Sequence, residues 1–436
     1  MSCPCEQHVW ERTKINPEWK EYTVNAQPRL DLDFVRSQFP AFAEPSLQGQ
    51  AFFENAGGSY ACAQVIGLLN EYYRRLKVQP YYSYPAATEA GQWMDRAHVR
   101  LGEYLNVAPE EIHLGPSTSQ NTYVLAQALR KSLKPGDEVI VTNQEHEANT
   151  GVFRRLAADG IIVREWGVER DTGALNPSEL DHLLSGRTKF LAVSHCSNVV
   201  AHVNPIAQIT TKARTVGALT IVDGVAFAPH GLPDVDALGA DIYLFSLYKT
   251  FGPHQGVMVV RKPLTEKLGN EGHHFNAAQI HKRLVPAGPD HAQVAAARGV
   301  AEYFDALDTH HGGTHAQGRP ERVRELLHGA EQPLLHRLLD YLKARKDVRL
   351  LGPSVARERA PTVSFVPHKI TPAEVHLALG KRGIMSGAGH FYAVRLLDAM
   401  GVDPARGVVR LSFVHYTSPQ EMTQLIEALD AILVRG

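Results

Sequence analysis

The stretch DIYLFSLYKTFGPHQGVMVV, residues 241–260, joins two apolar runs through a turn that holds one lysine. The first run covers 242–245 and the second begins at Val257, with polar residues, glycines and a proline between them. Short apolar runs bounded by glycine and proline predict buried strands. Lys249 therefore falls in a turn between two strands. It is either a solvated loop residue or an amine that takes part in chemistry.

Similar apolar runs precede this stretch, and segments with helical spacing separate them. Strands are predicted at 137–142, 161–166, 189–195, 219–224, 242–246 and 256–260, and helices at 121–134 and 206–217. Alternation of strands and helices predicts an α/β fold with a mostly parallel sheet. Because several strands are apolar almost throughout, we expect helices on both faces of that sheet.

The pattern changes after about residue 290. Long helices are predicted at 294–307 and 322–345, strands at 361–366 and 408–414, and further helices at 371–382 and 418–433. We therefore predict an N-terminal arm at 1–30, a large domain at 31–290 and a smaller α+β domain at 291–436. Within the large domain, 31–45 is the part expected to pack against the small domain.

The composition is that of an ordinary globular protein of 436 residues, 44% hydrophobic and 21% charged. A formal net charge of −1, with both signs mixed throughout, predicts neither nucleic acid nor an anionic membrane as a partner. No signal peptide or membrane span is recognisable, so we expect a cytoplasmic protein. Among the four cysteines, Cys3 and Cys5 form a close pair that completes neither a disulfide framework nor a metal site, and we expect no metal.

Polar residues fall where the predicted strands end, which is where open α/β sheets bind ligands. Asp223 ends one apolar strand and Lys249 follows another. This pair suggests pyridoxal phosphate, which needs a lysine for a Schiff base and an acid beside its pyridine nitrogen. A turn-capping aspartate and a surface lysine would give the same pattern, so the pair alone does not decide.

A phosphate site is suggested by GPSTSQNT, residues 115–122. Ser117, Thr118 and Ser119 stand just before or at the start of a predicted helix, whose N-terminus attracts anions. An ordinary N-cap has the same residues. No G-x-G-x-x-G or G-x-x-x-x-G-K-[ST] motif occurs, and NQEHEAN (143–149) is not H-E-x-x-H.

Taken in order, these segments resemble the class V aminotransferase family of fold-type I pyridoxal phosphate enzymes, and most closely its cysteine desulfurase-like members. The resemblance covers roughly 30–436 and rests on FFENAGGS (52–59), QEHEAN (144–149), VSHCSNVVAHVNPI (193–206), VDGVAFAPH (222–230), FSLYKTFGPHQG (245–256) and VVRLSFVHYTSPQEM (408–422). It implies a seven-stranded, mostly parallel sheet, a smaller C-terminal domain, pyridoxal phosphate as cofactor, an amino-acid substrate and a homodimer.

The resemblance also assigns roles to residues. It implies that Lys249 forms the Schiff base, Asp223 pairs with the pyridine nitrogen and His146 stacks on the ring. Cofactor contacts are further implied for Ser117, Thr118, Ser119, Asn198, Ser246, Tyr248 and, toward a neighbouring subunit, His291. Substrate contacts are implied for Asn55, Ala56, Gly57 and Arg410, whose guanidinium suits an α-carboxylate. His390 and Tyr392 are expected to face the active site and shape side-chain specificity; the alternative is that Phe391 and Tyr392 pack the lobe.

The chain departs from the family pattern at several of these positions. Glu54 stands where aspartate is usual, Ala201 replaces a glycine, Ala226 replaces a glutamine, Tyr248 replaces a histidine and Pro289 replaces a threonine. In cysteine desulfurases, a cysteine that forms a persulfide lies on a C-terminal loop. Here the loop is SGAGHFYAVR (386–395), Tyr392 takes that place, and no cysteine follows Cys196.

These departures lead to a functional prediction with alternatives. The expected enzyme acts through an external aldimine and a Cα carbanion, and we predict β-elimination by a C–S lyase on a cysteine-derived amino acid rather than cysteine desulfuration. A class V aminotransferase or an amino-acid epimerase is the second possibility. An inactive scaffold is the third.

Overall fold

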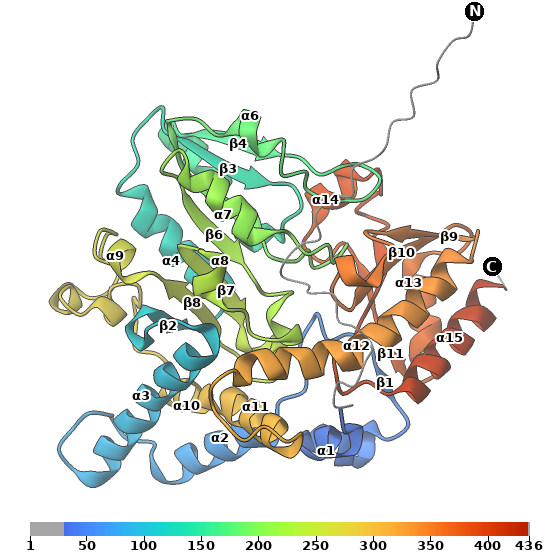
Figure 1. The fold of residues 1–436 in the computed structure, drawn as a ribbon, viewed down its shortest axis with the longest axis horizontal. Helices are drawn as coiled ribbons and strands as arrows, with labels where there is room; N and C mark the ends of the chain where they lie inside the picture. The colour runs from blue at the N-terminus through green and yellow to red at the C-terminus, as the bar shows by residue number, and fades with distance from the viewer. Residues whose placement is uncertain (1–29, 435–436) are drawn as a thin grey trace, which may run out of the picture.

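The computed structural model describes residues 30–434, so Cys3, Cys5 and most of the predicted arm at 1–30 lie outside the described part. A seven-stranded sheet forms its centre, in the order β2-β8-β7-β6-β5-β3-β4 (Figure 1). Strand β8 is antiparallel to β2 and β7, and all other neighbouring pairs are parallel. The strands are β2 (Ile112–Gly115), β3 (Glu138–Thr142), β4 (Ile162–Trp166), β5 (Thr188–Ser194), β6 (Leu219–Asp223), β7 (Ile242–Ser246) and β8 (Gly256–Val260). The predicted mostly parallel α/β sheet is confirmed.

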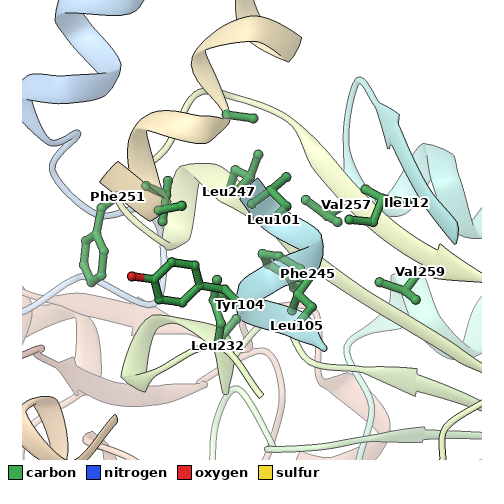
Figure 2. Packing of buried hydrophobic residues seen from close by; sticks show 14 of the residues in the cluster. Leu101, Tyr104, Leu105, Ile112, Leu232, Phe245, Leu247, Phe251, Val257 and Val259 are labelled. Carbon is green, nitrogen blue, oxygen red and sulfur yellow. The ribbon is translucent and has the colours of Figure 1, made fainter. Parts of the chain in front are cut away.

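Helices cover both faces of this sheet because successive side chains along its strands belong alternately to two hydrophobic cores. Tyr243 and Phe245 of β7 belong to one core, and Ile242 and Leu244 belong to the other. The first core includes residues of α2 (Ala63–Arg75), α3 (Pro85–Leu105), α7 (Ile206–Arg214), α10 (His291–Ala296) and α11 (Arg298–His310). The second includes residues of α4 (Thr118–Arg130) and α5 (Glu147–Arg154). Figure 2 shows Phe245, Val257 and Val259 beside Leu101 and Leu105 of α3 in the first core.

A second, four-stranded antiparallel sheet lies in the C-terminal part, in the order β12-β13-β10-β9. Its strands are β9 (Val348–Leu351), β10 (Thr362–Pro367), β12 (Gly387–Gly389) and β13 (Val408–Ser412). The helices here are α12 (Arg319–Lys343), α13 (Pro372–Gly380), α14 (Val394–Ala399) and α15 (Pro419–Leu433). Residues of α12, α13 and α15 share one apolar core with β10 and β13.

The entry segment joins this second part although it lies far away in sequence. Strand β1 (Ala51–Phe52) pairs in parallel with β11 (Ile384–Met385). Ala51 and Phe53 are buried in the core of the C-terminal sheet. The helix α1 (Leu32–Ser37) also reaches this part, since Arg36 donates to the carbonyl of Tyr416 at 3.0 Å. The proposed domain limits at 30 and 290 stay predictions.

The structure differs from the sequence-based elements in a few places. The helix expected at 294–307 is divided into α10 and α11, with Ala297 between them. The predictions did not include β2 and β9, which are only four residues each. Further short helices are α6 (Leu180–Leu183), α8 (Val235–Leu238) and α9 (Lys262–Thr265). Among the described residues, no helix is both long and apolar enough to cross a membrane.

Candidate active site

The predicted site residues gather at one edge of the large sheet. Asp223 ends β6, and it lies opposite Ser194 of β5 and Leu244 of β7 in the parallel pairing. Lys249 follows β7 in a single turn of 3-10 helix, and His146 follows β3 as the N-cap of α5. Because these strands are parallel, their carboxyl ends meet at the same edge. The topology therefore brings three chain segments together that the sequence separates widely.

Lys249 and Asp223 lie close enough for their charges to affect each other. Burial and, to a smaller extent, the charge of Arg410 together lower the pKa of Lys249 to about 8, although the charge of Asp223 opposes the shift. Burial raises the pKa of Asp223, while the N–H of Val225, which donates to Asp223 Oδ1 at 2.9 Å, and the charge of Lys249 lower it. Lys249 is therefore not a solvated loop residue, and its amine is readily deprotonated.

His146 is held as a neutral ring beside Lys249. Its Nδ1 accepts a hydrogen bond from the N–H of Ala148 at 3.1 Å. Burial and, to a smaller extent, the charges of Lys249 and Arg410 together lower the pKa of His146 to about 4. The ring centroid of Tyr392 lies 5.0 Å from that of His146. A neutral aromatic face is thus available next to the lysine.

The loop that carries His390 and Tyr392 is tied to the sheet edge. Asn198 Nδ2 donates to the carbonyl of Phe391 at 2.8 Å, and the N–H of Glu147 donates to the carbonyl of Tyr392 at 2.8 Å. Phe391 and Tyr392 have positive φ angles of 48° and 59°, which non-glycine residues adopt only when their surroundings hold them. Tyr392 is 65% exposed, and His390 accepts a hydrogen bond from its N–H.

The N-terminus of α4 forms a candidate anion site next to the end of β7. Ser117 is the N-cap, and its Oγ accepts from the N–H of Gln120 at 3.2 Å. The hydroxyls of Thr118 and Ser246 are 2.7 Å apart, so the helix and the strand meet there. Ser119 is the second residue of α4 and is exposed. Backbone N–H groups and hydroxyls converging on one point suit a phosphate.

Gly256 allows this approach. A Cβ at position 256 would lie 2.3 Å from the backbone nitrogen of Thr118 and 2.4 Å from the carbonyl carbon of Ser117. Any side chain would therefore push α4 away from the sheet. The second glycine of the GPHQG turn is required by the packing of the helix N-terminus.

Tyr248 lies beside the same anion site. Its ring stacks on His254, with centroids 4.5 Å apart. Burial raises the pKa of Tyr248, and a hydrogen bond with Ser246 opposes this shift. The tyrosine therefore directs its hydroxyl to Ser246, at the position where the family has a histidine.

Arg410 faces the entry segment and is already paired. Its Nη2 donates to Glu54 Oε1 at 2.7 Å, and its Nη1 donates to the carbonyl of Asn198 at 3.2 Å. The aromatic ring of Phe391 covers the guanidinium at 3.8 Å. Burial lowers the pKa of Arg410, and the charge of Glu54 opposes the shift. The sequence did not indicate this ion pair, because Glu54 was noted only as a departure from the family pattern.

Asn55, Ala56 and Gly57 connect the entry segment to the end of β13. Asn55 Nδ2 donates to the carbonyl of Ser412 at 3.2 Å, and Asn55 Oδ1 accepts from the hydroxyl of Tyr416. The N–H of Ala56 donates to Ser412 Oγ at 2.8 Å. These contacts hold the segment beside Arg410. The side chain of Asn55 is thereby engaged in structural hydrogen bonds.

His291 lies elsewhere in the same chain. It is the first residue of α10, and its pKa is lowered by burial and by Lys77, while Asp290 raises it. Lys249 and Asp223 are not among the groups that influence it. Residues 284–290 do line a cavity of about 830 Å³ together with Ser117 and His254.

Glu145 was missed by sequence reasoning, although it precedes His146. Three groups donate to its carboxylate, each at 2.7 Å: the hydroxyl of Thr142, the amide of Asn149 and the N–H of Ser194. Burial, with a smaller contribution from the charge of Asp223, raises the pKa of Glu145 to about 7, although these three hydrogen bonds oppose the shift. Only the fold buries this residue, so no sequence signal distinguishes it from a surface glutamate.

The residues present fit pyridoxal phosphate. An anion site, a buried amine and a buried carboxylate occupy neighbouring strand ends. Asn198 Oδ1 and Arg410 Nε are buried without a hydrogen-bond partner within residues 30–434, which is expected where a bound group supplies the partners.

Comparison with known proteins agrees with this site. The model of the aminotransferase class-V family matches residues 51–425. Over 417 residues, the chain is 34% identical to the aminotransferase-like protein FGM3 of Gibberella zeae, covering 93% of this chain and 99% of that protein. It is 29% identical over 411 residues to a probable cysteine desulfurase of Pseudomonas aeruginosa, covering 91% and 97%. A cysteine desulfurase of Thermococcus onnurineus NA1 has the same fold, with a TM-score of 0.82 at 22% identity and coverage of 94% and 100%.

Proposed function

The chain belongs to the class-V aminotransferase family, and from this premise we propose that it is a C–S lyase acting by β-elimination on a cysteine-derived amino acid. The family membership makes it a pyridoxal phosphate-dependent enzyme of the cysteine desulfurase-like kind. The choice of reaction rests on the position of the thiols.

One observation carries this choice. The two cysteines within the described part of the chain, Cys62 and Cys196, are buried, and burial raises the pKa of both to about 12. Neither is a thiolate at neutral pH, and neither lies on the loop 386–395, where Tyr392 stands next to His146. Without a thiolate acceptor on this loop, sulfur would leave with its substituent rather than pass to the protein.

The cofactor would be held by the groups described above. Thr118, Ser119, Ser246 and Tyr248 would bind its phosphate at the N-terminus of α4, and Asp223 would pair with its ring nitrogen. His146 would lie against the ring, and Lys249 would supply the amine. When bound, the cofactor withdraws electrons from the substrate Cα.

Lys249 is the group that moves protons in this proposal. With a pKa near 8, its amine is partly deprotonated at neutral pH and can accept the Cα proton. The Cβ–S bond then breaks with its electron pair on sulfur, and the sulfur leaves as a thiol after taking up a proton. The three-carbon product would then be released, and water would convert it to pyruvate and ammonia. The imidazole of His146, with a pKa of about 4, is a much weaker base than the Lys249 amine and does not compete for that proton.

The test is incubation of the cofactor-loaded enzyme with S-substituted cysteines while pyruvate and free thiol are measured. We expect both products in equal amounts, and none from the Lys249→Ala variant. Absence of pyruvate with every conjugate tried, in protein that carries the cofactor, would refute the lyase assignment.

Transamination is the second candidate, because the matching family model is that of aminotransferases. An amino donor would then convert the cofactor to its pyridoxamine form and become its 2-oxo acid, so the visible absorbance band would be lost and no thiol would be released. Exchange of the Cα proton with solvent, without net product, would indicate epimerisation instead.

We also propose a homodimer. Residues 284–290 line the same cavity as Ser117, while the charge of Lys77 in its own chain influences His291. A second copy packed at this cavity would be the route by which His291 reaches a phosphate. Light scattering during size-exclusion chromatography tests this, and a monomer at micromolar concentration would refute it.

A further inference from the structure

Arg410, the residue expected to bind a substrate α-carboxylate, already holds a carboxylate of its own chain. Its Nη2 donates to Glu54 Oε1 at 2.7 Å. The side chain of Arg410 is 4% exposed and that of Glu54 is 27% exposed. The pair is therefore mostly withdrawn from water, where a charge-assisted hydrogen bond is stronger than on the surface.

The carboxylate of Glu54 lies in a recess that fits it. A Cβ at Gly57 would lie 2.7 Å from Glu54 Oε1, and a Cβ at Gly387 would lie 2.8 Å from Glu54 Oε2. Phe391 covers the guanidinium at 3.8 Å. Two glycines thus leave the room that the carboxylate occupies, so the ion pair is built into the packing.

Strand pairing fixes the two partners beside each other. Glu54 bridges Ser412 in parallel, and Arg410 pairs with Gly387 across the neighbouring strand. The backbone of the entry segment is also bonded to Ser412, through the N–H of Ala56. The backbone of Glu54 is therefore held by a β-bridge and by the neighbouring hydrogen bond to Ser412, and it does not lie in a freely moving loop.

A second carboxylate that binds at Arg410 incurs one of two free-energy costs. It adds a like charge next to Glu54 in a poorly hydrated pocket, or it displaces Glu54 and leaves that carboxylate without its partner. One oxygen, Glu54 Oε2, is already buried without a hydrogen-bond partner among residues 30–434. A substrate without an α-carboxylate meets neither cost.

We propose that Glu54 takes the place of a substrate α-carboxylate on Arg410, so that the site accepts primary amines lacking this group as readily as the corresponding α-amino acids. The inference deepens the proposed function, because it uses the same amine-binding site at Lys249. It assigns Glu54 the role of the specificity-determining residue. Cysteamine-derived sulfides then belong to the substrate class together with cysteine-derived ones.

The experiment compares S-methyl-L-cysteine with S-methylcysteamine, which differ only in the α-carboxylate. Equilibrium affinities are measured from the visible absorbance of the loaded protein, in wild type, Glu54→Gln and Glu54→Ala. Binding of propionate to the cofactor-free protein is measured by calorimetry in the same three forms. Glu165→Gln is the matched control, because it removes a carboxylate from a surface ion pair with Arg154.

In wild type, we expect the two affinities to agree within about threefold, and propionate to bind weakly. Glu54→Gln should strengthen binding of S-methyl-L-cysteine and propionate by about tenfold or more and leave S-methylcysteamine unchanged, since a hydrogen-bonded charge competitor has been removed. Glu165→Gln should behave as wild type. If the Glu54→Gln variant fails to fold, the same affinity changes are expected, and measured, in the Glu54→Ala variant.

The inference is overturned if wild type already prefers the carboxylated compound by tenfold or more, or if neither Glu54 variant changes propionate binding. These readouts are equilibrium affinities, so they stand even if no pyruvate is produced. Failure of the lyase assignment is thereby distinguished from failure of the role given to Glu54.

Discussion

Replacing Gly256 with alanine tests whether close packing of α4 on the sheet creates the anion site. The new Cβ would lie 2.3 Å from Thr118 N, 2.4 Å from Ser117 C and 2.7 Å from Ser117 O, all of them backbone atoms. Backbone atoms cannot rotate out of the way as a side chain can, so the helix N-terminus must move by roughly 1 Å to restore ordinary van der Waals contact. Overpacking of this kind costs about 1–3 kcal/mol.

Two measurements follow from this displacement. For a chain of this size, the cost corresponds to a fall of roughly 1–4 °C in the thermal midpoint. Since the donors of the anion site move as well, the affinity for pyridoxal phosphate should fall about tenfold or more, as expected when one charge-assisted hydrogen bond is misaligned. Thermal denaturation of the cofactor-free protein and fluorescence titration with the cofactor measure the two effects separately.

Gly67→Ala is the matched control. Gly67 is an exposed residue in α2, and a Cβ there would meet nothing within 4 Å. Alanine should stabilise this helix position by up to about 1 kcal/mol and leave cofactor affinity unchanged. The reasoning fails if Gly256→Ala binds the cofactor as tightly as wild type and denatures at the same temperature.

Three further predictions concern the strand ends. Borohydride treatment of the loaded protein should add the cofactor mass to the peptide that contains Lys249, and the Lys249→Ala variant should gain none; labelling of a different lysine would contradict the assignment. The deprotonated amine is the reactive form, so the rate of cofactor binding to the cofactor-free protein should rise from pH 7 to 9 and level off above the Lys249 pKa of about 8. Stopped-flow traces measure this rate, and a midpoint near pH 10 would disprove the lowered pKa. Asp223→Asn should weaken cofactor binding by about 10–100-fold, as expected for loss of a buried charge-assisted hydrogen bond, while Asp241→Asn, at the opposite end of β7, should have no such effect in the same titration.

Much of the fold was predictable because the signals were local. The apolar runs at 242–246 and 256–260 became β7 and β8 with the predicted limits. Buried parallel strands carry this signal in their own residues. By contrast, β1 has two residues, and its partner β11 lies more than 300 positions away, so no local sequence pattern predicts the pairing.

Residues whose chemistry is unusual at their position could be singled out from the sequence, whereas residues whose chemistry is created by burial could not. Lys249 and Asp223 stood out as charges at the ends of apolar strands. Glu145 did not, because its raised pKa comes from burial by segments distant in sequence. Ala201 is a related case: it has a φ of 56° where the family has a glycine, and the surrounding core holds it in that conformation.

The sequence by itself determined the alternation of strands and helices and, through its motifs taken together, the class of cofactor, because these depend on residue types and short spacings. Only the tertiary structure decided that Glu54 lies on Arg410 and that Phe391 covers the pair. The physical reason is that an ion pair depends on distance in space and on exclusion of water. Both arise when segments near residues 54, 390 and 410 are packed against one another.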